Sequence, residues 1–531
     1  NNIEKLFSSI YLEKVNQSLK NGIKIGNPKV LYLYEYYPLF KKYFEILGFE
    51  VILEEGSQKK LKDGTNLINS DFCAPMILSH GIVKSLLDKN VDYIFFPTMI
   101  NEKNLVEDND KKFMEKKSDA YFCYYSEYAP TIINYLTTLD LQDKLISPEI
   151  SFNNTSIFDV AENIANSLIE KNLYVNKKET LINNFVITYE DFKNKNKLWK
   201  NENEKILLEK SNNFKIVFFG RPYTFFDKTI NLNIPTSLEE KGYTILYQSG
   251  LKAEIDNNLY SRKILDKMHW HYGQEILLGA EMVAKSNDLY AIFLTCFRCS
   301  PDSYLITYFK EIMSKYNKPY LIIQLDEHTS DVGYQTRIEA ALESFKIHYN
   351  SKKEPITINS TNYKNDEIKK DYTVLLPYLS SIISELQKEA FIANGYKAIV
   401  LPLDQKIINS GYRYASGGEC MPNVAIVGSV IDTIKNSAID PAKTIVYIPT
   451  VCMACNFNQY SILIEMALEK SGLKEVKIAN PNTLKQLPEL PKELNVNLLE
   501  VNILGSILYK LYYRYNPYEL NKGDAKKALD S

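Results

Sequence analysis

Short apolar runs alternate along the chain with amphipathic stretches. This pattern is typical of a parallel β-sheet wrapped by helices, because strands that are buried on both faces are apolar throughout. Amphipathic stretches predict helices at residues 38–47 and 381–394. We therefore expect an α/β protein built from several Rossmann-like, doubly wound parallel-sheet domains in two related modules. The apolar runs predict strands at residues 29–34, 49–53, 215–219, 243–247, 289–294, 396–401 and 444–448.

The chain of 531 residues is too long for one ordinary domain. The polar stretch 351–372 is the expected linker between the two modules, and the Lys-, Asn- and Glu-rich stretch 189–210 is expected to be a solvated helix or linker. The predicted parts, in chain order, are a first Rossmann-like domain at 1–148, a helical connection at 149–212, a second Rossmann-like domain at 213–350, and a second, incomplete module at 351–531 that starts with its own Rossmann-like domain.

Two sequence patterns recur. A helix, a glycine, an aromatic residue and an apolar strand follow one another at Gly48, Gly242 and Gly395, which predicts a left-handed glycine at each helix end. The motif Cys-x-Pro starts at Cys73 and at Cys420, and each copy is followed at the same offset by a glycine, then by a helix and a strand that ends in Pro-Thr. The length of this second match is the reason for expecting two related modules.

Composition excludes several classes of protein. Hydrophobic residues make up 45% and charged residues 24%, as in soluble globular chains, and no apolar stretch is long enough for a transmembrane helix. The formal net charge of −2 gives no bulk attraction to nucleic acid or to an anionic membrane, so neither is expected as a partner. Seven cysteines without a secretory signal favour metal or redox chemistry in a reducing cytoplasm over a disulfide framework.

The cysteines are the main candidates for chemistry, and their positions differ. Cys73 and Cys420 each precede a predicted helix, whose N-terminus favours an anion such as a thiolate. Cys123 lies in the aromatic run YFCYY, which predicts a short strand or its end. For any single cysteine, the alternative is a small buried apolar residue.

Two Cys-x-x-Cys pairs, Cys296/Cys299 and Cys452/Cys455, follow apolar strands, where open α/β sheets bind ligands. A local zinc ribbon is excluded because the two pairs lie too far apart in the chain. A thioredoxin-type dithiol remains possible, although it leaves the repeated Cys-x-Pro motif unexplained. An iron–sulfur site, which draws cysteines from several loops, accounts for more of them.

Other motifs are few. The chain has no P-loop, no GxSxG, no GxGxxG and no HExxH sequence. The segment from Gly220 to Tyr223 directly follows the predicted strand 215–219, so Arg221 is placed to contact a phosphate or carboxylate. The alternative is a turn with an exposed arginine.

Several of these segments, taken in order, resemble one known family. They are the stretch VLYLYEYYPLFKKYFEILGFEVIL, the motif around Cys73, Gly220-Arg-Pro-Tyr223, Cys299-Ser-Pro-Asp302 and Gly418-Glu-Cys420-Met-Pro422. Together they resemble the 2-hydroxyacyl-CoA dehydratase-like proteins, and more specifically the large fused, activase-related members that are relatives of the double-cubane cluster proteins. The resemblance extends over residues 28–523.

The resemblance implies a cofactor and a partner. The cofactor is an oxygen-sensitive iron–sulfur cluster, either 4Fe–4S or a double cubane, at the junction of two Rossmann-like modules. The partner is an ATP-hydrolysing activase that holds its own 4Fe–4S cluster and delivers low-potential electrons. The substrate is a small molecule or a 2-hydroxyacyl-CoA. Fused members carry the activase modules ahead of this region, so the chain is expected to be a fragment of such a protein.

The resemblance also assigns residues. The implied cluster ligands are Cys73, Cys123 and Cys299 in the first module and Cys420 and Cys455 in the second. Cys296 and Cys452 are additional to the family pattern, and a third cysteine of the second module would lie downstream.

Arg221 and Tyr223 are the expected cofactor contacts, whereas no catalytic acid or base is identified. We expect an iron–sulfur reductase or dehydratase-like component. The alternatives are a non-catalytic scaffold or binding module of the same fold and a dithiol redox protein.

Overall fold

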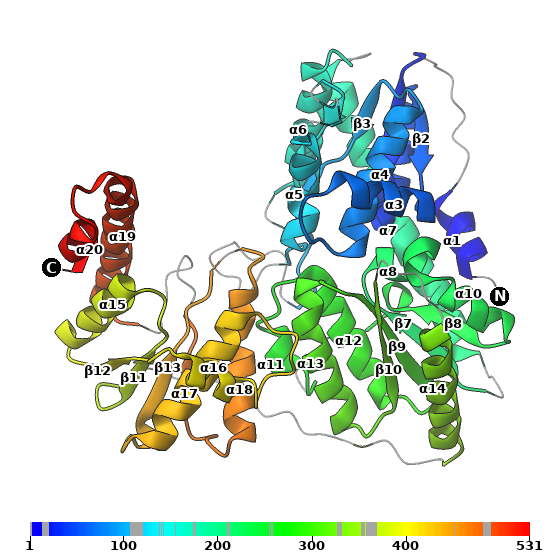
Figure 1. Ribbon diagram of the computed structural model, residues 1–531. Coiled ribbons are helices and arrows are strands. Elements are labelled where there is room, and N and C mark those ends of the chain that lie inside the picture. The colour runs from blue at the N-terminus through cyan, green and yellow to red at the C-terminus, as the bar shows by residue number, and fades with distance from the viewer. Residues whose placement is uncertain are drawn as a thin grey trace. The chain divides into compact units, whose positions relative to one another are not determined.

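The computed structural model describes most of the chain in two compact units (Figure 1). Among the described residues, those up to 361 form unit 1 and those from 362 onward form unit 2, and each unit is considered by itself. The break falls within the polar stretch 351–372. The described residues are 3–12, 21–106, 120–136, 138–139, 141, 143–153, 155–173, 177–209, 213–253, 255, 259–326, 332–351, 356, 369–451, 453–481 and 490–530.

Unit 1 contains two four-stranded sheets in which all pairs of strands are parallel. The first has the order β2-β1-β3-β5, and a parallel pair of short strands, β4 and β6, continues it; the second has the order β10-β9-β7-β8. The strands are β1 (Lys24–Pro28), β2 (Glu50–Glu54), β3 (Tyr93–Phe95), β4 (Thr98–Asn101), β5 (Leu145–Ile146), β6 (Glu149–Ser151), β7 (Lys215–Phe219), β8 (Thr244–Tyr247), β9 (Leu289–Cys296) and β10 (Tyr320–Leu325).

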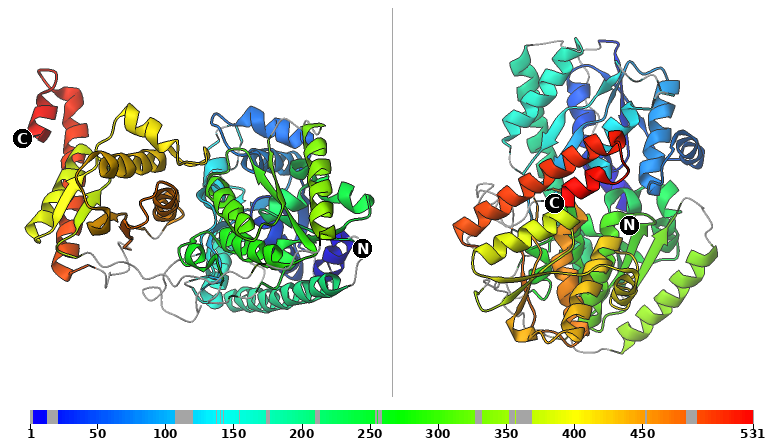
Figure 2. Two further views of the ribbon diagram at one scale, coloured as in Figure 1. Left: turned by 90° about the horizontal axis from the view of Figure 1, so that it is seen from below. Right: turned by 60° about the vertical axis from the view of Figure 1, so that its left-hand side comes forward.

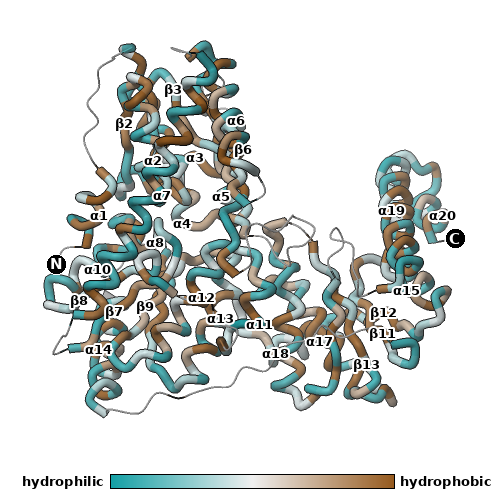
Figure 3. The backbone as a smooth tube through the Cα atoms, turned by 180° about the vertical axis from the view of Figure 1, so that it is seen from behind, coloured by the Kyte–Doolittle hydropathy of each residue, from teal (hydrophilic) through white to brown (hydrophobic). Residues whose placement is uncertain are grey.

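Helices cover both faces of the sheets of unit 1, as the two views of Figure 2 show. In Figure 3 the helices alternate between hydrophobic and hydrophilic positions, as expected for helices with one buried side. They are α1 (Ile3–Tyr11), α2 (Leu33–Ile46), α3 (Gln58–Leu67), α4 (Ala74–Asp88), α5 (Tyr124–Asn134), α6 (Ile157–Glu170), α7 (Lys178–Leu208), α8 (Pro222–Phe226), α9 (Lys228–Asn231), α10 (Ile234–Glu240), η2 (Gln248–Gly250), α11 (Arg262–Leu265), α12 (His271–Lys285), α13 (Ser300–Lys315) and α14 (Val332–Asn350).

Unit 2 contains one parallel sheet with the order β12-β11-β13-β14. Its strands are β11 (Thr373–Leu376), β12 (Lys397–Val400), β13 (Thr444–Tyr447) and β14 (Lys477–Ala479). Its helices are α15 (Ser381–Ala393), α16 (Gln405–Gly411), α17 (Met421–Asn436), η3 (Pro441–Lys443), η4 (Asn456–Gln459), α18 (Tyr460–Lys470), α19 (Lys492–Tyr515), η5 (Asn516–Tyr518) and α20 (Asp524–Asp530). The expected α/β class with parallel, Rossmann-like sheets is therefore confirmed. None of the described helices combines the length and apolar content that a membrane span requires.

The three predicted helix-ending glycines have the expected left-handed backbone. The φ angles of Gly48, Gly242 and Gly395 are +86°, +89° and +79°. After each glycine, the next backbone N–H donates to the carbonyl five residues earlier, as from Phe49 to Phe44 at 3.0 Å. The same turn therefore leads from a helix into β2, β8 and β12, which are edge strands of the three four-stranded sheets.

The repeated Cys-x-Pro motif starts equivalent helices that cross a neighbouring helix in the same way. In unit 1, a Cβ at Gly81 of α4 would lie 1.8 Å from the Lys60 carbonyl oxygen of α3, and one at Gly64 of α3 would lie 2.0 Å from the Ile77 carbonyl oxygen. Only glycine permits backbones to approach this closely.

The crossing of α16 and α17 in unit 2 repeats this geometry. A Cβ at Gly428 would lie 2.2 Å from the Ile407 carbonyl oxygen, and one at Gly411 would lie 2.0 Å from that of Val424. Gly64 and Gly411 stand at the same distance before their cysteines in the sequence. The internal repeat is therefore a repeat of helix packing, and its second glycine was not among the sequence predictions.

One predicted element is wrong, and a second is right only in part. The apolar run 29–34 is not a strand: β1 ends at Pro28, and α2 begins at Leu33 instead of at residue 38. The stretch 189–210 is helical up to Leu208, as predicted, but one side of this helix, α7, is buried instead of solvated. Most of the buried residues of α7 recur every three or four positions: Leu181, Phe185, Thr188, Tyr189, Phe192, Lys195, Trp199, Asn203 and Ile206.

Candidate functional site

The five cysteines assigned as ligands occupy the same local position, the residue directly before a helix. Each has an extended backbone, with φ between −65° and −78°, and none of their side chains caps the helix with a hydrogen bond. The backbone N–H groups of Met76 and Ser126 in the first turns are nevertheless near enough to lower the pKa of Cys73 and Cys123. They are Cys73 before α4, Cys123 before α5, Cys299 before α13, Cys420 before α17 and Cys455 before η4.

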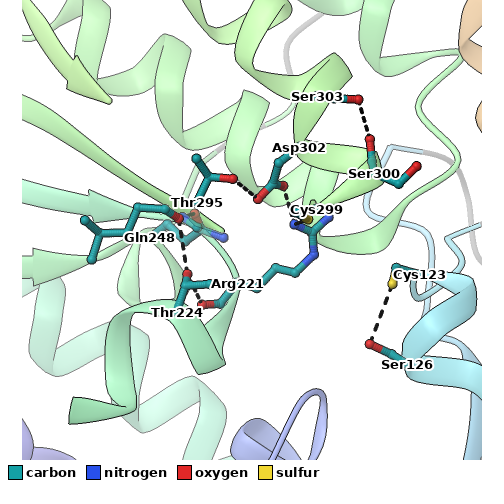
Figure 4. Close-up of polar contacts among 12 residues, drawn as sticks. Cys123, Ser126, Arg221, Thr224, Gln248, Thr295, Cys299, Ser300, Asp302 and Ser303 are labelled. Atoms are coloured by element: carbon teal, nitrogen blue, oxygen red, sulfur yellow. Dashed lines mark hydrogen bonds and ion pairs between the residues drawn. The ribbon is translucent and has the colours of Figure 1, made fainter. Parts of the chain in front are cut away.

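Cys123 lies where a short bridged segment gives way to a helix. Its aromatic neighbours predicted a short strand or its end; Tyr121 forms isolated β-bridges with Asn101 and Trp270, and α5 begins at Tyr124. Cys123 thus joins Cys73 and Cys420 as a cysteine at a helix N-terminus. Its Sγ lies 3.8 Å from the hydroxyl of Ser126 in the first turn of α5 (Figure 4).

Three of these cysteines come together in unit 1. Burial is the largest cause that raises the pKa of Cys73, to about 12, and the neighbouring thiol of Cys123 adds to it. Burial also raises the pKa of Cys299, with smaller contributions from Cys73 and Cys123, while Arg221 opposes the shift. Cys73, Cys123 and Cys299 are therefore close enough to interact electrostatically, although they come from distant parts of the chain.

Arg221 provides the positive charge of this cluster. It precedes α8 at the end of β7, and its side chain is only 2% exposed. Its Nη1 donates to Cys299 Sγ at 3.1 Å and forms an ion pair with the carboxylate of Asp302 (Figure 4). The other oxygen of Asp302 accepts from the Thr295 hydroxyl at 2.6 Å. The alternative of an exposed arginine in a turn is therefore wrong.

The turn that carries Arg221 depends on Gly220. The φ angle of Gly220 is +142°, and a Cβ there would lie 2.4 Å from the Leu294 carbonyl oxygen of β9 and from the Thr224 hydroxyl. Its N–H donates to Gln248 Oε1 at 3.0 Å. The chain therefore leaves β7 pressed against β9, and this directs Arg221 toward Cys299.

Tyr223 belongs to the same group of residues. It is buried, and its pKa is raised first by burial, then by the thiols of Cys123, Cys299 and Cys73, while Arg221 lowers it. Arg221 and Tyr223, the two expected cofactor contacts, thus lie beside all three assigned cysteines of unit 1.

Cys296 is also close, but its surroundings differ. It is the last residue of β9, is buried, and its carbonyl accepts from the Cys299 N–H at 3.0 Å. Burial raises the pKa of both Cys296 and Cys299, and both are free thiols. A reactive dithiol needs a lowered pKa to form its thiolate, so this environment disfavours the dithiol interpretation for the pair.

In unit 2, Tyr460 contacts one of the two assigned cysteines. The Tyr460 hydroxyl lies 2.6 Å from the sulfur of half-buried Cys420, and Tyr460 begins α18 directly after η4, which Cys455 precedes. Cys455 is exposed. Asn458 braces the loop before η4, since its side chain pairs with both the N–H and the carbonyl of Val451 at 2.8 Å. Cys452 lies outside the described residues.

The thiols of this site are the type of donor that binds iron in iron–sulfur clusters. Among the described residues, no group of three or more His, Cys, Asp or Glu side chains is arranged to hold a metal ion. A cluster does not need ligands that converge on one atom, because each thiolate binds a different iron. The nearby carboxylate of Asp302 is already engaged by Arg221 and Thr295, which leaves thiols as the available donors.

Comparison with known proteins relates part of unit 1 to CoA enzyme activation. Residues 24–251 match the model of a family described as the CoA enzyme activase uncharacterised domain. A search of curated proteins found no match. The matched region contains Cys73, Cys123, Arg221 and Tyr223, and it ends before Cys299. Unit 1 therefore contains a CoA enzyme activase-related domain, which agrees at this coarse level with the family resemblance of the sequence.

Proposed function

We propose that a chain with a CoA enzyme activase-related domain uses Cys73, Cys123 and Cys299 of unit 1 to hold an iron–sulfur cluster. In this proposal the chain is the electron-accepting component of a reductase or dehydratase-like system, and an ATP-hydrolysing activase with its own 4Fe–4S cluster supplies low-potential electrons. The description of the matched family supports a link to CoA enzyme activation. The substrate is then a small molecule or a 2-hydroxyacyl-CoA.

The observation that carries the proposal is the meeting of three helix-starting thiols beside Arg221. Each helix N-terminus places partial positive charge behind its sulfur, and the guanidinium adds a full charge. A cluster bound by thiolates is an anion, so these groups stabilise it. An arrangement of cysteines that served only as small apolar side chains would not require three helix N-termini and a buried arginine at one place.

The residues divide the work of holding such a cluster. Cys73, Cys123 and Cys299 would supply the thiolates, and a bound cluster would supply one-electron transfer and, at an iron without a thiolate, Lewis acidity. Burial keeps the thiols protonated in the empty site, so loading must release their protons. The hydrogen bond from Arg221 to Cys299 Sγ stabilises added negative charge, which raises the reduction potential.

The test is anaerobic analysis of iron and acid-labile sulfide in the purified chain. We expect a brown protein with about four irons per chain for one cubane, or about eight if the cysteines of unit 2 complete a second site. The variants Cys73→Ala, Cys123→Ala and Cys299→Ala should each lose the iron of unit 1. Cys296→Ala is the matched control, because it removes a buried thiol that does not begin a helix, and it should keep its iron.

A colourless chain that lacks iron after anaerobic preparation, or one that holds stoichiometric zinc, would contradict the proposal. Unchanged iron content in the Cys73 and Cys299 variants would also contradict it. Either result would favour a non-catalytic scaffold that keeps the fold. Cys420→Ala and Cys455→Ala report separately on unit 2, since a loss of about half of eight irons there would assign the second site to these two residues.

A further inference from the structure

Unit 1 contains a cavity of about 200 Å³ that is lined by none of the cysteines. Three of its lining residues follow the carboxyl ends of strands: Glu102 follows β4, Pro222 follows β7 by way of Gly220 and Arg221, and Ser249 follows β8. Ligands of open α/β sheets bind beyond these strand ends. The rest of the wall comes mainly from α1, α2, α7 and α12.

Aromatic rings form much of this wall. Phe7 of α1 contacts the ring of Trp199 of α7 edge-on, with centroids 5.6 Å apart, and the ring of Tyr11 at 4.5 Å. Phe226 and Phe192 extend the same surface. Faces of such rings carry partial negative charge and attract cations.

Three carboxyl groups face the same cavity: Glu35 of α2, Glu102 and Glu275 of α12. The Tyr272 hydroxyl donates to Glu35 Oε2 at 3.0 Å, and the Tyr36 hydroxyl donates to Glu102. Burial, Glu275 and Glu102 raise the pKa of Glu35 to about 8. Acids that line one cavity repel one another when ionised, and a positive charge among them reduces that repulsion, as Lys200 does for Glu35.

Two polar groups of the wall are left without partners. His271 is only 3% exposed and lines the cavity, and its Nδ1 has no hydrogen-bond partner among the described residues. The buried hydroxyl of Ser249, also in the wall, is likewise unsatisfied within the described part of the chain. Buried polar atoms are usually paired, so unpaired ones beside a cavity point to a missing ligand or bound water.

We propose that this cavity binds a small organic cation, with an amine or ammonium group that meets the carboxylates of Glu35, Glu102 and Glu275 and an apolar body that packs on the aromatic wall. Lys103, Lys193 and Lys200 also line the cavity, so the aromatic faces and the cluster of carboxyl groups, and not the net charge of the wall, favour a cation. Lys193 pairs with Glu190 at 3.6 Å, and Lys200 is close enough to Glu35 to lower its pKa. The site uses no thiol, so it goes beyond the proposed cluster and does not depend on it.

The experiment titrates the full chain with 2-phenylethylammonium and, as the matched anion, with phenylacetate. Calorimetry measures affinity and stoichiometry, and the fluorescence of Trp199, one of two tryptophans in the chain, reports on the wall. We expect the amine to bind at one site per chain and phenylacetate not to bind. Glu35→Gln and Glu275→Gln should each weaken amine binding about tenfold, as for the loss of one charge-assisted contact.

Glu179→Gln is the control, because Glu179 is an exposed carboxylate on α7 outside the cavity wall, and this variant should bind the amine like the parent chain. Unfolding curves of each variant without the probe show whether it folds. The proposal is overturned if the amine does not bind at millimolar concentration, if phenylacetate binds as tightly, or if Glu35→Gln and Glu275→Gln bind like the control. Amine binding by Cys73→Ala without iron would separate this site from the cluster.

Discussion

Replacing Gly81 with alanine would push apart two helices whose contact positions Cys73. A Cβ at residue 81 would lie 1.8 Å from the Lys60 carbonyl oxygen, whereas ordinary contacts of this kind begin at 3.4 Å. The obstacle is backbone, so no side-chain rotation relieves it, and α3 and α4 must separate by about 1.6 Å. Overpacking costs about 1–3 kcal/mol, and we expect Gly81→Ala to reach about 3 kcal/mol because the obstacle is backbone and α4 is buried along most of its length.

The matched control is Gly333→Ala. Gly333 lies in the first turn of α14, in the same unit, is exposed, and has nothing within 4 Å of a built Cβ. Alanine is the better helix former, so this variant should lose no stability and gain up to about 1 kcal/mol. Urea unfolding followed by circular dichroism measures both variants, and equal m-values show that the change lies in stability.

The reasoning would be refuted if Gly81→Ala unfolded at the same urea concentration as Gly333→Ala. Gly428→Ala provides a second trial in unit 2, because a Cβ there meets the Ile407 carbonyl oxygen at 2.2 Å. A destabilised Gly81→Ala chain that also lost iron on anaerobic preparation would connect the helix crossing to the position of Cys73.

Three further predictions concern single side chains. Asp302→Asn should lower the free energy of unfolding by about 3 kcal/mol in urea, because it leaves the buried guanidinium of Arg221 without its charged partner; a loss below about 1 kcal/mol would contradict this. The folded state raises the pKa of Glu35 to about 8 from 4.5, so it holds an extra proton between these values and its stability falls as pH rises through them. Thermal unfolding of Glu35→Gln should therefore show a smaller loss between about pH 5 and pH 8 than the parent chain, and parallel curves would exclude the shift. Ser156→Ala removes the capping box at the start of α6 and should cost about 1 kcal/mol in urea unfolding, whereas no change would show that the cap is not formed.

The sequence predicted the fold class well where strands are central and buried. The strand at 215–219 matches β7 in both bounds, since a central strand covered on both faces is apolar throughout and is followed by Gly220. The error at 29–34 has the opposite cause. There α2 is buried on several sides, so its apolar residues run together as in a strand. β1 itself contains Gly26 and Pro28, and a Cβ at Gly26 would crowd Leu86 at 3.1 Å.

The sequence identified residues that lie together in the candidate site, but it did not reveal the contacts between them. The motifs around Arg221 and Cys299 were recognised separately, but the hydrogen bond between them joins residues far apart in the chain, which no local spacing encodes. The aromatic residues around Cys123 predicted a short strand or its end, which agrees with the β-bridges of Tyr121, but they did not reveal that α5 begins at Tyr124. The ligand roles of all five assigned cysteines, the cofactor contacts of Arg221 and Tyr223, and the domain boundaries stay predictions.

The position of the five assigned cysteines directly before helices has a consequence for stability. Serine, threonine, aspartate or asparagine before a helix is worth about 1 kcal/mol over residues that cannot accept from the first turn, and the weakly accepting sulfur of each of the five assigned cysteines makes no full cap. Burial of the Cys73 side chain offsets part of this lost stability, whereas the exposed side chain of Cys455 offsets none of it. Stability therefore does not explain why cysteine occupies these positions. In a chain redesigned only for a higher free energy of unfolding, they would be among the first residues to be replaced.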